Sequence, residues 1–304
     1  MIRHIQISMI TALLSLTALL LPQSLRSEGL SKLADTHLHW KWNQKEVTEP
    51  EQAIKILRDN QVALAVVTGA PPELALELHE LAPDLVIPIY GVYQGRSDWS
   101  NWYRDKSMVG RVRKALATGR YRGIGELHMI GGFISDWKHP NIAALFQLAA
   151  EFDVPVLVHT EFSRANYLIG FCSAHPETRF LWAHAGSVVP PVEVARALGQ
   201  CDNLSVELSA RDPWRHVGMR IADESGHLKK EWHDLVIANA DRFMIGSDPV
   251  WPVEQLNPWD EPDTGWHHLT RFLNFHRNWL EQLPEDVAQK VAYQNALDYF
   301  KSQK

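Results

Sequence analysis

Short apolar runs alternate with helical segments along the chain from residue 33 to the C-terminus. Eight runs have the length and the β-branched content of buried strands, at 33–39, 63–68, 86–92, 123–128, 154–160, 179–184, 204–208 and 243–247. No low-complexity linker separates them, so residues 28–304 are expected to form one domain. An eightfold alternation of strand and helix favours an α/β fold, a closed (β/α)8 TIM barrel, over an open sheet.

The segments that follow the strands are longer than those that lead into them. Residues 91–107, 210–229 and 249–263 are long and irregular, whereas the segments that lead into strands are short. In a barrel, the loops after the strands build the active site at the C-terminal face. The asymmetry therefore predicts an active site at that face.

The first 27 residues have the pattern of a secretory signal peptide. Arg3 and His4 precede an apolar run at 5–21, and the small residues Ser24 and Ser27 follow it. We expect cleavage between about residues 22 and 29 and a periplasmic or secreted protein. An uncleaved membrane anchor is the alternative, because the run is near the lower length limit for a membrane span.

The charge of the chain excludes some partners. The formal net charge is -6, so no basic field is available to hold a nucleic acid or an anionic membrane surface. The two cysteines, Cys172 and Cys201, lie in the expected mature region, where an exported location permits a disulfide. Two buried thiols that pack as small hydrophobic groups are the favoured interpretation.

Ligand-type side chains occur where the predicted strands end. His37 and His39 lie two apart on the first strand, so both point to the same face. Later strands end in four more such residues, namely Glu126, His159, His184 and Asp248. A buried strand does not end in an unpaired polar group without cost. The recurrence on one rim predicts a divalent metal site built from all six residues.

These residues resemble the amidohydrolase superfamily, and more narrowly its amidohydrolase-related branch of barrel hydrolases, lactonases and decarboxylases. The resemblance rests on the His-x-His at 37 and 39, on His159 and His184, on Gly246-Ser-Asp-Pro249 and on the C-terminal Asn295-Ala-Leu-Asp-Tyr-Phe300. It implies that His37, His39, His159 and Asp248 bind a catalytic metal. It also implies that His184 binds a second ion or hydrogen-bonds the substrate.

The fourth strand departs from the best-known two-metal pattern of the superfamily. It offers Glu126 and no lysine, so a carboxylated lysine cannot bridge two ions here. Glu126 either bridges two ions, hydrogen-bonds a metal ligand or contacts the substrate. The number of bound ions, one or two, is therefore left open. Zinc is the expected metal because histidines and carboxylates suit a borderline ion, and manganese is the alternative.

Other side chains follow the strand ends and suggest how a small-molecule substrate binds. Arg211 and Arg215 are expected either to grip a substrate carboxylate or to pin their loop by pairing with Asp212 or Asp260. Five tryptophans suggest an aromatic pocket for a ring-shaped, carboxylated substrate, with Trp40 and Trp214 as its foremost walls and Trp42, Trp137 and Trp251 beside them.

Three functions are compatible with this pattern. The favoured one is a metal-dependent hydrolase of a lactone, ester or amide, in which Asp248 is the general base and the metal, or His184 beside it, polarises the carbonyl. The second is a non-oxidative decarboxylase or hydratase of a carboxylated ring or unsaturated acid. The third is a non-catalytic barrel that binds a metal or ligand. Release of carbon dioxide separates the second function from the first.

Overall fold

A computed structural model describes residues 30, 32–95, 98–99, 101–129, 134, 136–161, 163–215, 220–223, 225–250 and 261–301. Each of the eight predicted strands is present within these residues. Their bounds are β1 Leu33–Lys41, β2 Val62–Ala70, β3 Val86–Ile89, β4 Ile124–His128, β5 Val156–His159, β6 Phe180–Trp182, β7 Leu204–Glu207 and β8 Phe243–Met244. β6 and β8 are shorter than predicted, because the backbone leaves the extended conformation before the predicted strand ends.

The strands form two parallel sheets, in the orders β1-β2-β3 and β4-β5-β6-β7-β8. Backbone hydrogen bonds cross both boundaries between the sheets. Tyr90, just after β3, donates to the carbonyl of Gly123 before β4 at 2.8 Å, and Thr36 of β1 donates to the carbonyl of Ile245 after β8 at 3.0 Å. The fold is therefore α/β with parallel sheets, as the alternation of apolar runs and helices predicts.

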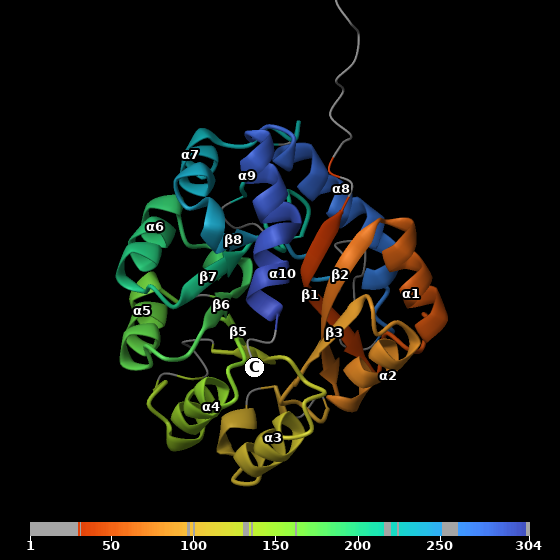
Figure 1. Cartoon of the computed structure of the whole chain (residues 1–304), viewed down its shortest axis with the longest axis vertical. Helices are drawn as coiled ribbons and strands as arrows, with labels where there is room; N and C mark the ends of the chain where they lie inside the picture. Colours follow the sequence, from red (N-terminus) through yellow and green to blue (C-terminus); the bar gives the residue numbers. More distant parts are fainter. Residues whose placement is uncertain are drawn as a thin grey trace, which may run out of the picture.

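Helices lie around the outside of the strands, and α10 crosses the middle of the view in Figure 1. The bounds are α1 Pro50–Asp59, α2 Glu73–Leu81, α3 Met108–Leu116, α4 Pro140–Glu151, α5 Ala165–Ala174, α6 Pro191–Gln200, α7 Lys230–Ala238, α8 Leu269–Leu280, α9 Glu285–Gln289 and α10 Asn295–Phe300. In α1, Ala53, Ile54 and Leu57 are buried. This spacing places the three side chains on one face, which packs against the strands.

Two apolar clusters make up the core. The larger cluster lies between strands and helices and includes Leu38 and Trp40 of β1. The smaller one joins inward-facing residues such as Ala34 and Leu181 to Ala296 and Phe300 of α10. Because α10 also accepts hydrogen bonds from arginines that precede β4 and β6, it covers the N-terminal ends of the strands. The opposite, C-terminal ends are left to carry the polar residues.

The prediction of two separate thiols is wrong. Cys172 in α5 and Cys201, which caps α6, form a disulfide with their Cα atoms 6.0 Å apart. Sequence spacing does not reveal this pairing, because it depends on how two neighbouring helices end side by side.

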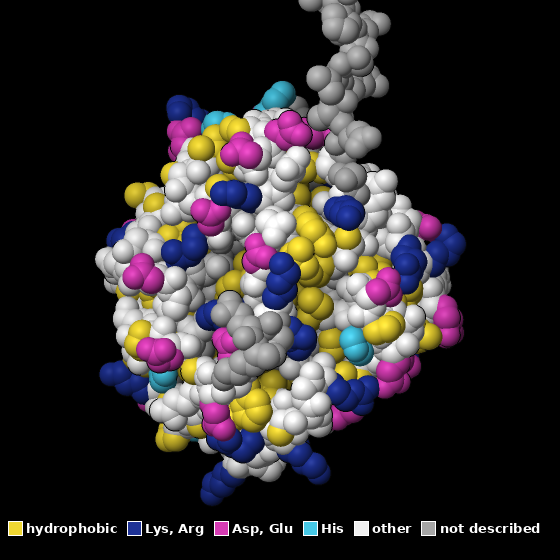
Figure 2. Space-filling model, in the orientation of Figure 1, with side chains coloured by type: hydrophobic (Ala, Val, Ile, Leu, Met, Phe, Trp, Pro, Cys, Tyr) yellow, Lys and Arg dark blue, Asp and Glu magenta, His cyan; other side chains and the backbone are white. Residues whose placement is uncertain are grey.

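Figure 2 shows basic and acidic side chains interspersed on the face that it presents, without a field of one sign. Among the described residues, no helix has the length and apolar character needed to cross a membrane. The predicted signal peptide lies outside the described residues.

Candidate metal centre

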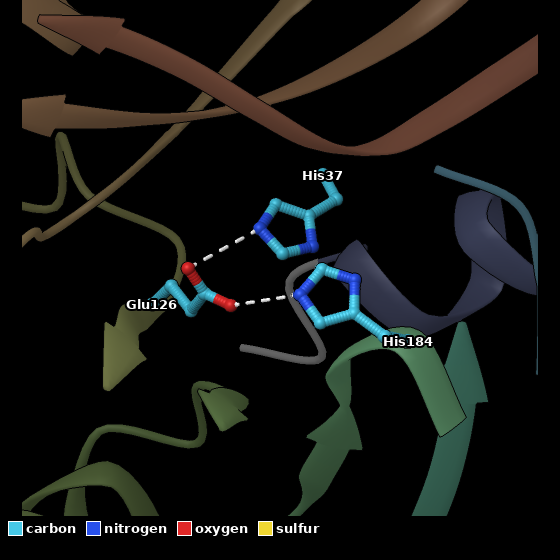
Figure 3. A group of neighbouring side chains, drawn as sticks. All are labelled: His37, Glu126 and His184. Atoms are coloured by element: carbon cyan, nitrogen blue, oxygen red, sulfur yellow. Dashed lines mark ion pairs between the residues drawn. The ribbon is translucent and has the colours of Figure 1, made fainter. Parts of the chain in front are cut away.

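The ends of five strands bring ligand-type side chains together. His37 and His39 project from the inner face of β1, because their neighbours Leu38 and Trp40 belong to the outer core. Figure 3 shows the carboxylate of Glu126 next to two imidazoles, with one oxygen facing His37 and the other facing His184. All six residues predicted to bind metal, namely His37, His39, Glu126, His159, His184 and Asp248, meet in this region.

One group of donor atoms, which we call cluster A, consists of His37 Nε2, His39 Nε2, Asp248 Oδ1 and Glu126 Oε2. The two imidazole nitrogens lie 3.1 Å apart, and Glu126 Oε2 lies 3.5 Å from His37 Nε2 and 3.4 Å from His39 Nε2. Asp248 Oδ1 lies 3.3 Å from His39 Nε2 and 3.9 Å from His37 Nε2. The other three donors therefore all lie within 3.9 Å of His37 Nε2.

A second group, cluster B, uses the other oxygen of Glu126. His159 Nδ1 lies 2.8 Å from Glu126 Oε1, and His184 Nε2 lies 3.4 Å from the same oxygen. The two imidazole nitrogens are 3.1 Å apart. Asp248 Oδ2 also faces this group, 3.9 Å from His184 Nε2. Glu126 and Asp248 thus each direct one oxygen to cluster A and the other to cluster B.

The spacing of these donors fits a divalent metal ion. Four donors placed tetrahedrally at the usual zinc–nitrogen and zinc–oxygen distances lie about 3.3 Å from one another. The separations in cluster A scatter around that value. Asp248 Oδ1 is buried and has no hydrogen-bond partner among the described residues. A buried carboxylate oxygen in that state is costly unless a cation satisfies it.

Glu207, at the end of β7, supports the donors from behind, and the sequence-based prediction missed it. Its carboxylate is fully buried and accepts from His37 Nδ1 at 2.9 Å, from the backbone N–H of His184 at 2.8 Å and from Ser209 Oγ at 2.9 Å. A carboxylate on Nδ1 holds the proton there and leaves Nε2 of His37 free to bind a metal. The strand-end position that revealed the other six residues was the available signal.

Buried charge determines the protonation of this site in the absence of metal. Burial alone would raise the pKa of Glu207, but His37 and several hydrogen bonds lower that pKa to about 2. Burial alone would lower the pKa of His159, yet Glu126 and Glu161 raise that pKa to about 9. His159 therefore tends to hold a proton that a metal must displace.

The backbone turns sharply at two of the six residues. His184 has φ 57° and Asp248 has φ 46°, which are left-handed conformations that non-glycine residues adopt rarely. His184 follows the end of β6 by two residues, and Asp248 follows the end of β8 by four. Just before Asp248, a side chain on Gly246 would come within 2.7 Å of His37 Cβ and Glu207 Oε2. Glycine at this position allows β8 to approach the site.

Comparison with known proteins identifies the family of this chain. The family model described as amidohydrolase matches residues 104–301. The chain belongs to the amidohydrolase family. No curated protein matches it by sequence.

Solved structures with the same fold are distant in sequence. One is described as a probable 2-pyrone-4,6-dicarboxylic acid hydrolase from Acinetobacter baumannii with citric acid bound, at 13% identity and TM-score 0.56, covering 88% of this chain and 98% of that chain. A second is an amidohydrolase from Burkholderia multivorans with bound zinc, at 14% identity and TM-score 0.54, with the same coverage.

A third similar structure is a dihydroorotase from Campylobacter jejuni, at 13% identity and TM-score 0.51, covering 90% of this chain and 85% of that chain. At these identities the likeness shows the fold alone. The family match supplies the rest: this chain is an enzyme of the amidohydrolase superfamily, a metal-dependent hydrolase in general, with a small molecule as its substrate.

The two arginines of this amidohydrolase that were expected near a substrate carboxylate bind the protein itself. Arg211 is buried and donates to the carbonyls of His184 at 2.7 Å and of Ala185 at 2.7 Å. Arg215 donates from Nε to Asp212 at 2.8 Å and from Nη2 to the carbonyl of Ser247 at 2.8 Å. These bonds favour the interpretation in which both residues pin their loops. Asp260, the other suggested partner, lies outside the described residues.

The predicted tryptophan walls are mostly packing residues. Trp40 is fully buried, donates to Glu77 at 2.9 Å and stacks edge-on against Trp266. Successive side chains of a strand point to opposite faces, so Trp40 lies on the outer face of β1 when its neighbour His39 lies on the inner face. Its interpretation as a pocket wall is therefore wrong. Trp214 packs edge-on against Phe275 and beneath the guanidinium of Arg271.

Of the other three tryptophans, Trp137 packs against Phe171 and Trp42 is 39% exposed. Trp251 lies outside the described residues.

Other residues at this rim lie after β3, at the end of β4 and after β5. Tyr93 Oη lies 2.6 Å from His128 Nδ1, and His128 Nε2 lies 3.3 Å from Glu126 Oε2. The ring of Trp99 lies over His128, with the ring centres 3.7 Å apart. Glu161 Oε2 lies 3.2 Å from His159 Nε2. These contacts form an aromatic and acidic border beside clusters A and B.

Proposed function

We propose that this amidohydrolase binds two divalent ions, one at cluster A and one at cluster B, with Glu126 as the bridging ligand. The observation that carries the proposal is that the two carboxylate oxygens of Glu126 face different histidines. Oε2 lies next to His37 and His39, and Oε1 lies next to His159 and His184. Zinc is the expected ion because the donors are imidazoles and carboxylates at near-tetrahedral spacing, and manganese is the alternative.

The scaffold of the site is a closed (β/α)8 barrel in this proposal. Backbone hydrogen bonds from Tyr90 to Gly123 and from Thr36 to Ile245 link the two parallel sheets at both boundaries. The neighbours with the same fold support the assignment. In a barrel of this type the C-terminal ends of the strands carry the active site, as clusters A and B do here.

The proposed reaction is hydrolysis of a lactone, ester or amide. Bound divalent ions supply Lewis acidity and lower the pKa of water toward neutrality. Asp248 accepts the proton of the attacking water and later returns it to the leaving oxygen or nitrogen. Its two oxygens span clusters A and B, at 3.3 Å from His39 Nε2 and 3.9 Å from His184 Nε2. His184 would be one of the residues that hold the second ion, through Nε2 in cluster B.

The substrate proposed is a small, ring-shaped molecule. The neighbour described as a probable 2-pyrone-4,6-dicarboxylic acid hydrolase is consistent with a carboxylated ring. The aromatic border of Tyr93, Trp99 and His128 supports a flat substrate next to Glu126. In this proposal Arg211 does not bind the carboxylate of the substrate, because its guanidinium already donates to backbone carbonyls.

We further propose that the chain is exported, with residues 1–27 removed as a signal peptide. The disulfide between Cys172 and Cys201 supports an oxidising compartment such as the periplasm or the exterior of the cell. N-terminal sequencing of protein from the native host tests this. An intact Met1 on a cytoplasmic protein contradicts it.

Metal analysis of a double variant tests the proposed function. Replacing His37 and His39 together by Ala is expected to lower bound metal by at least one equivalent and to abolish turnover, with the fold retained. The matched control replaces two histidines away from the site, the exposed His227 and the partly exposed His233, by Ala and is expected to change neither property. Unchanged metal content in the first variant overturns the ligand assignment.

A substrate screen completes the test. Lactones, esters and amides are offered to the metal-loaded enzyme, and each product is identified. Uptake of water at a carbonyl that ceases on chelation supports the hydrolase. Release of carbon dioxide from a carboxylated ring in place of hydrolysis indicates a decarboxylase.

A further inference from the structure

His128 is a buried polar residue beside clusters A and B to which the proposed reaction gives no chemical step. It ends β4 two residues after Glu126, so both side chains lie on the same face of the strand. Its side chain is 4% exposed, and its Nε2 lies 3.3 Å from Glu126 Oε2. With Glu126 and His159 it makes a group of ligand-type atoms that could hold a metal by proximity alone.

The hydrogen bonds of Tyr93 decide which nitrogen of His128 carries the proton. The phenolic oxygen accepts from the backbone N–H of His128 at 2.9 Å and also lies 2.6 Å from His128 Nδ1. A backbone N–H only donates, so the single hydrogen of the phenol remains available for another acceptor. Within the described part of the chain, His128 Nδ1 is the acceptor found for it.

The opposite arrangement leaves a polar hydrogen without a partner. If Nδ1 carried the proton, both contacts would donate to the phenolic oxygen, and the hydroxyl hydrogen of a buried tyrosine would lack an acceptor. The arrangement that satisfies each group has Nδ1 unprotonated and Nε2 protonated. An N–H at Nε2 has no lone pair with which to bind a metal.

We propose that His128 is a neutral hydrogen-bond donor that contacts an oxygen of the substrate, and that Tyr93 is the positioning residue that fixes its tautomer. The oxygen is the carbonyl or tetrahedral oxyanion of the group under attack, next to Glu126. Trp99 covers the ring of His128 and limits its rotation. This inference rests on the proposed function for the identity of the substrate group, whereas the tautomer stands independently of it.

Nuclear magnetic resonance of the full chain, labelled with ¹⁵N-histidine and loaded with ¹¹³Cd, tests the tautomer. We expect the nitrogens of His128, identified by their loss in His128→Gln, to show a protonated Nε2 without coupling to cadmium. In Tyr93→Phe the two tautomers of His128 are expected to mix. Coupling of cadmium to His128, or a proton on Nδ1 in the wild type, overturns the proposal.

Binding of methylphosphonate, a tetrahedral anion that resembles a hydrated carbonyl, tests the contact in the zinc-loaded protein. His128→Ala is expected to weaken its binding about tenfold with bound zinc unchanged. His128→Gln is expected to restore much of the affinity because its amide N–H reaches the place of Nε2. His128→Asn is not expected to restore it, because its side chain is too short.

Equal affinities of His128→Ala and the wild type, or loss of zinc from His128→Ala, overturn the donor role. A wild-type protein that binds no divalent ion contradicts the proposed function, and the tautomer measurement on the metal-free chain still decides the protonation of His128.

Discussion

Both ends of the strands carry polar groups that are at least partly buried, but the two ends satisfy these groups differently. At the N-terminal ends, three arginines donate to backbone carbonyls: Arg122 to Phe300 at 3.0 Å, Arg179 to Tyr299 at 2.6 Å and Arg242 to Cys201 at 2.6 Å. The disulfide lies at this end as well, because α5 and α6 end next to the starts of β6 and β7. Here the chain supplies its own partners.

At the C-terminal ends, the polar groups face one another and leave a donor set incomplete. Imidazole and carboxylate atoms lie 2.8–3.9 Å apart in clusters A and B, and Asp248 Oδ1 has no hydrogen-bond partner among the described residues. A set of this kind is complete only when a cation joins it. The comparison teaches that polar groups with backbone hydrogen-bond partners contribute to stability, whereas polar groups that need a bound cation contribute to catalysis.

Among single substitutions, the largest effect is expected from Asp248→Asn at the C-terminal end. Removing the proposed base lowers turnover by roughly 10²–10⁴-fold, while the fold and much of the bound metal remain. The measurement is turnover per bound metal on a substrate found by screening. Asp241→Asn, on the exposed surface, serves as the control. Near-normal turnover of Asp248→Asn rules out the base.

The disulfide at the opposite end is expected to affect stability alone. Replacing Cys172 and Cys201 together by Ala opens a cross-link between residues 29 apart and lowers the free energy of unfolding by about 3 kcal/mol. Denaturant unfolding measures this change, and metal content with turnover in the folded variant serves as the control. Loss of metal without loss of stability is the result that breaks the division between the two ends.

A change at Glu207 tests whether a residue that hydrogen-bonds a proposed metal ligand contributes to metal binding at the C-terminal ends of the strands. Glu207→Gln keeps the size of the side chain but removes the charge that holds His37 Nδ1. Metal affinity is expected to fall 10–100-fold. Competition with a chelator measures the affinity, and Glu193→Gln, an exposed residue of α6, is the matched control. Unchanged affinity removes Glu207 from the metal centre.

The smallest effect is expected from Arg179→Met at the N-terminal end. The substitution removes hydrogen bonds to the carbonyls of Tyr299 and Asp153 and lowers the free energy of unfolding by about 1 kcal/mol, with metal affinity unchanged. Arg58→Met, at an exposed position in α1, controls for the loss of a charge. A drop in metal affinity at Arg179→Met is inconsistent with the separation of the two ends.

The strand ends were predictable from the sequence because each carries a local signal. An apolar run that stops at a histidine or carboxylate identifies both the strand and its polar end, and this rule found Glu126, His184 and Asp248. Glu207 has the same signal, in the run at 204–208, and was missed although it lies behind His37.

Alternation along a strand also determines Trp40 from its neighbour His39: adjacent residues face opposite sides, so a histidine that points inward sends the tryptophan outward.

The sequence by itself determined the order of strands and helices and the residue types at the strand ends, because apolar periodicity and strand alternation act over a few neighbouring residues. Only the tertiary structure decided which segments meet. It paired Cys172 with Cys201, turned Arg211 toward the carbonyl of His184 and divided the oxygens of Glu126 between clusters A and B. These contacts join residues far apart in the chain, and their geometry depends on how whole elements pack, for which local sequence carries no signal.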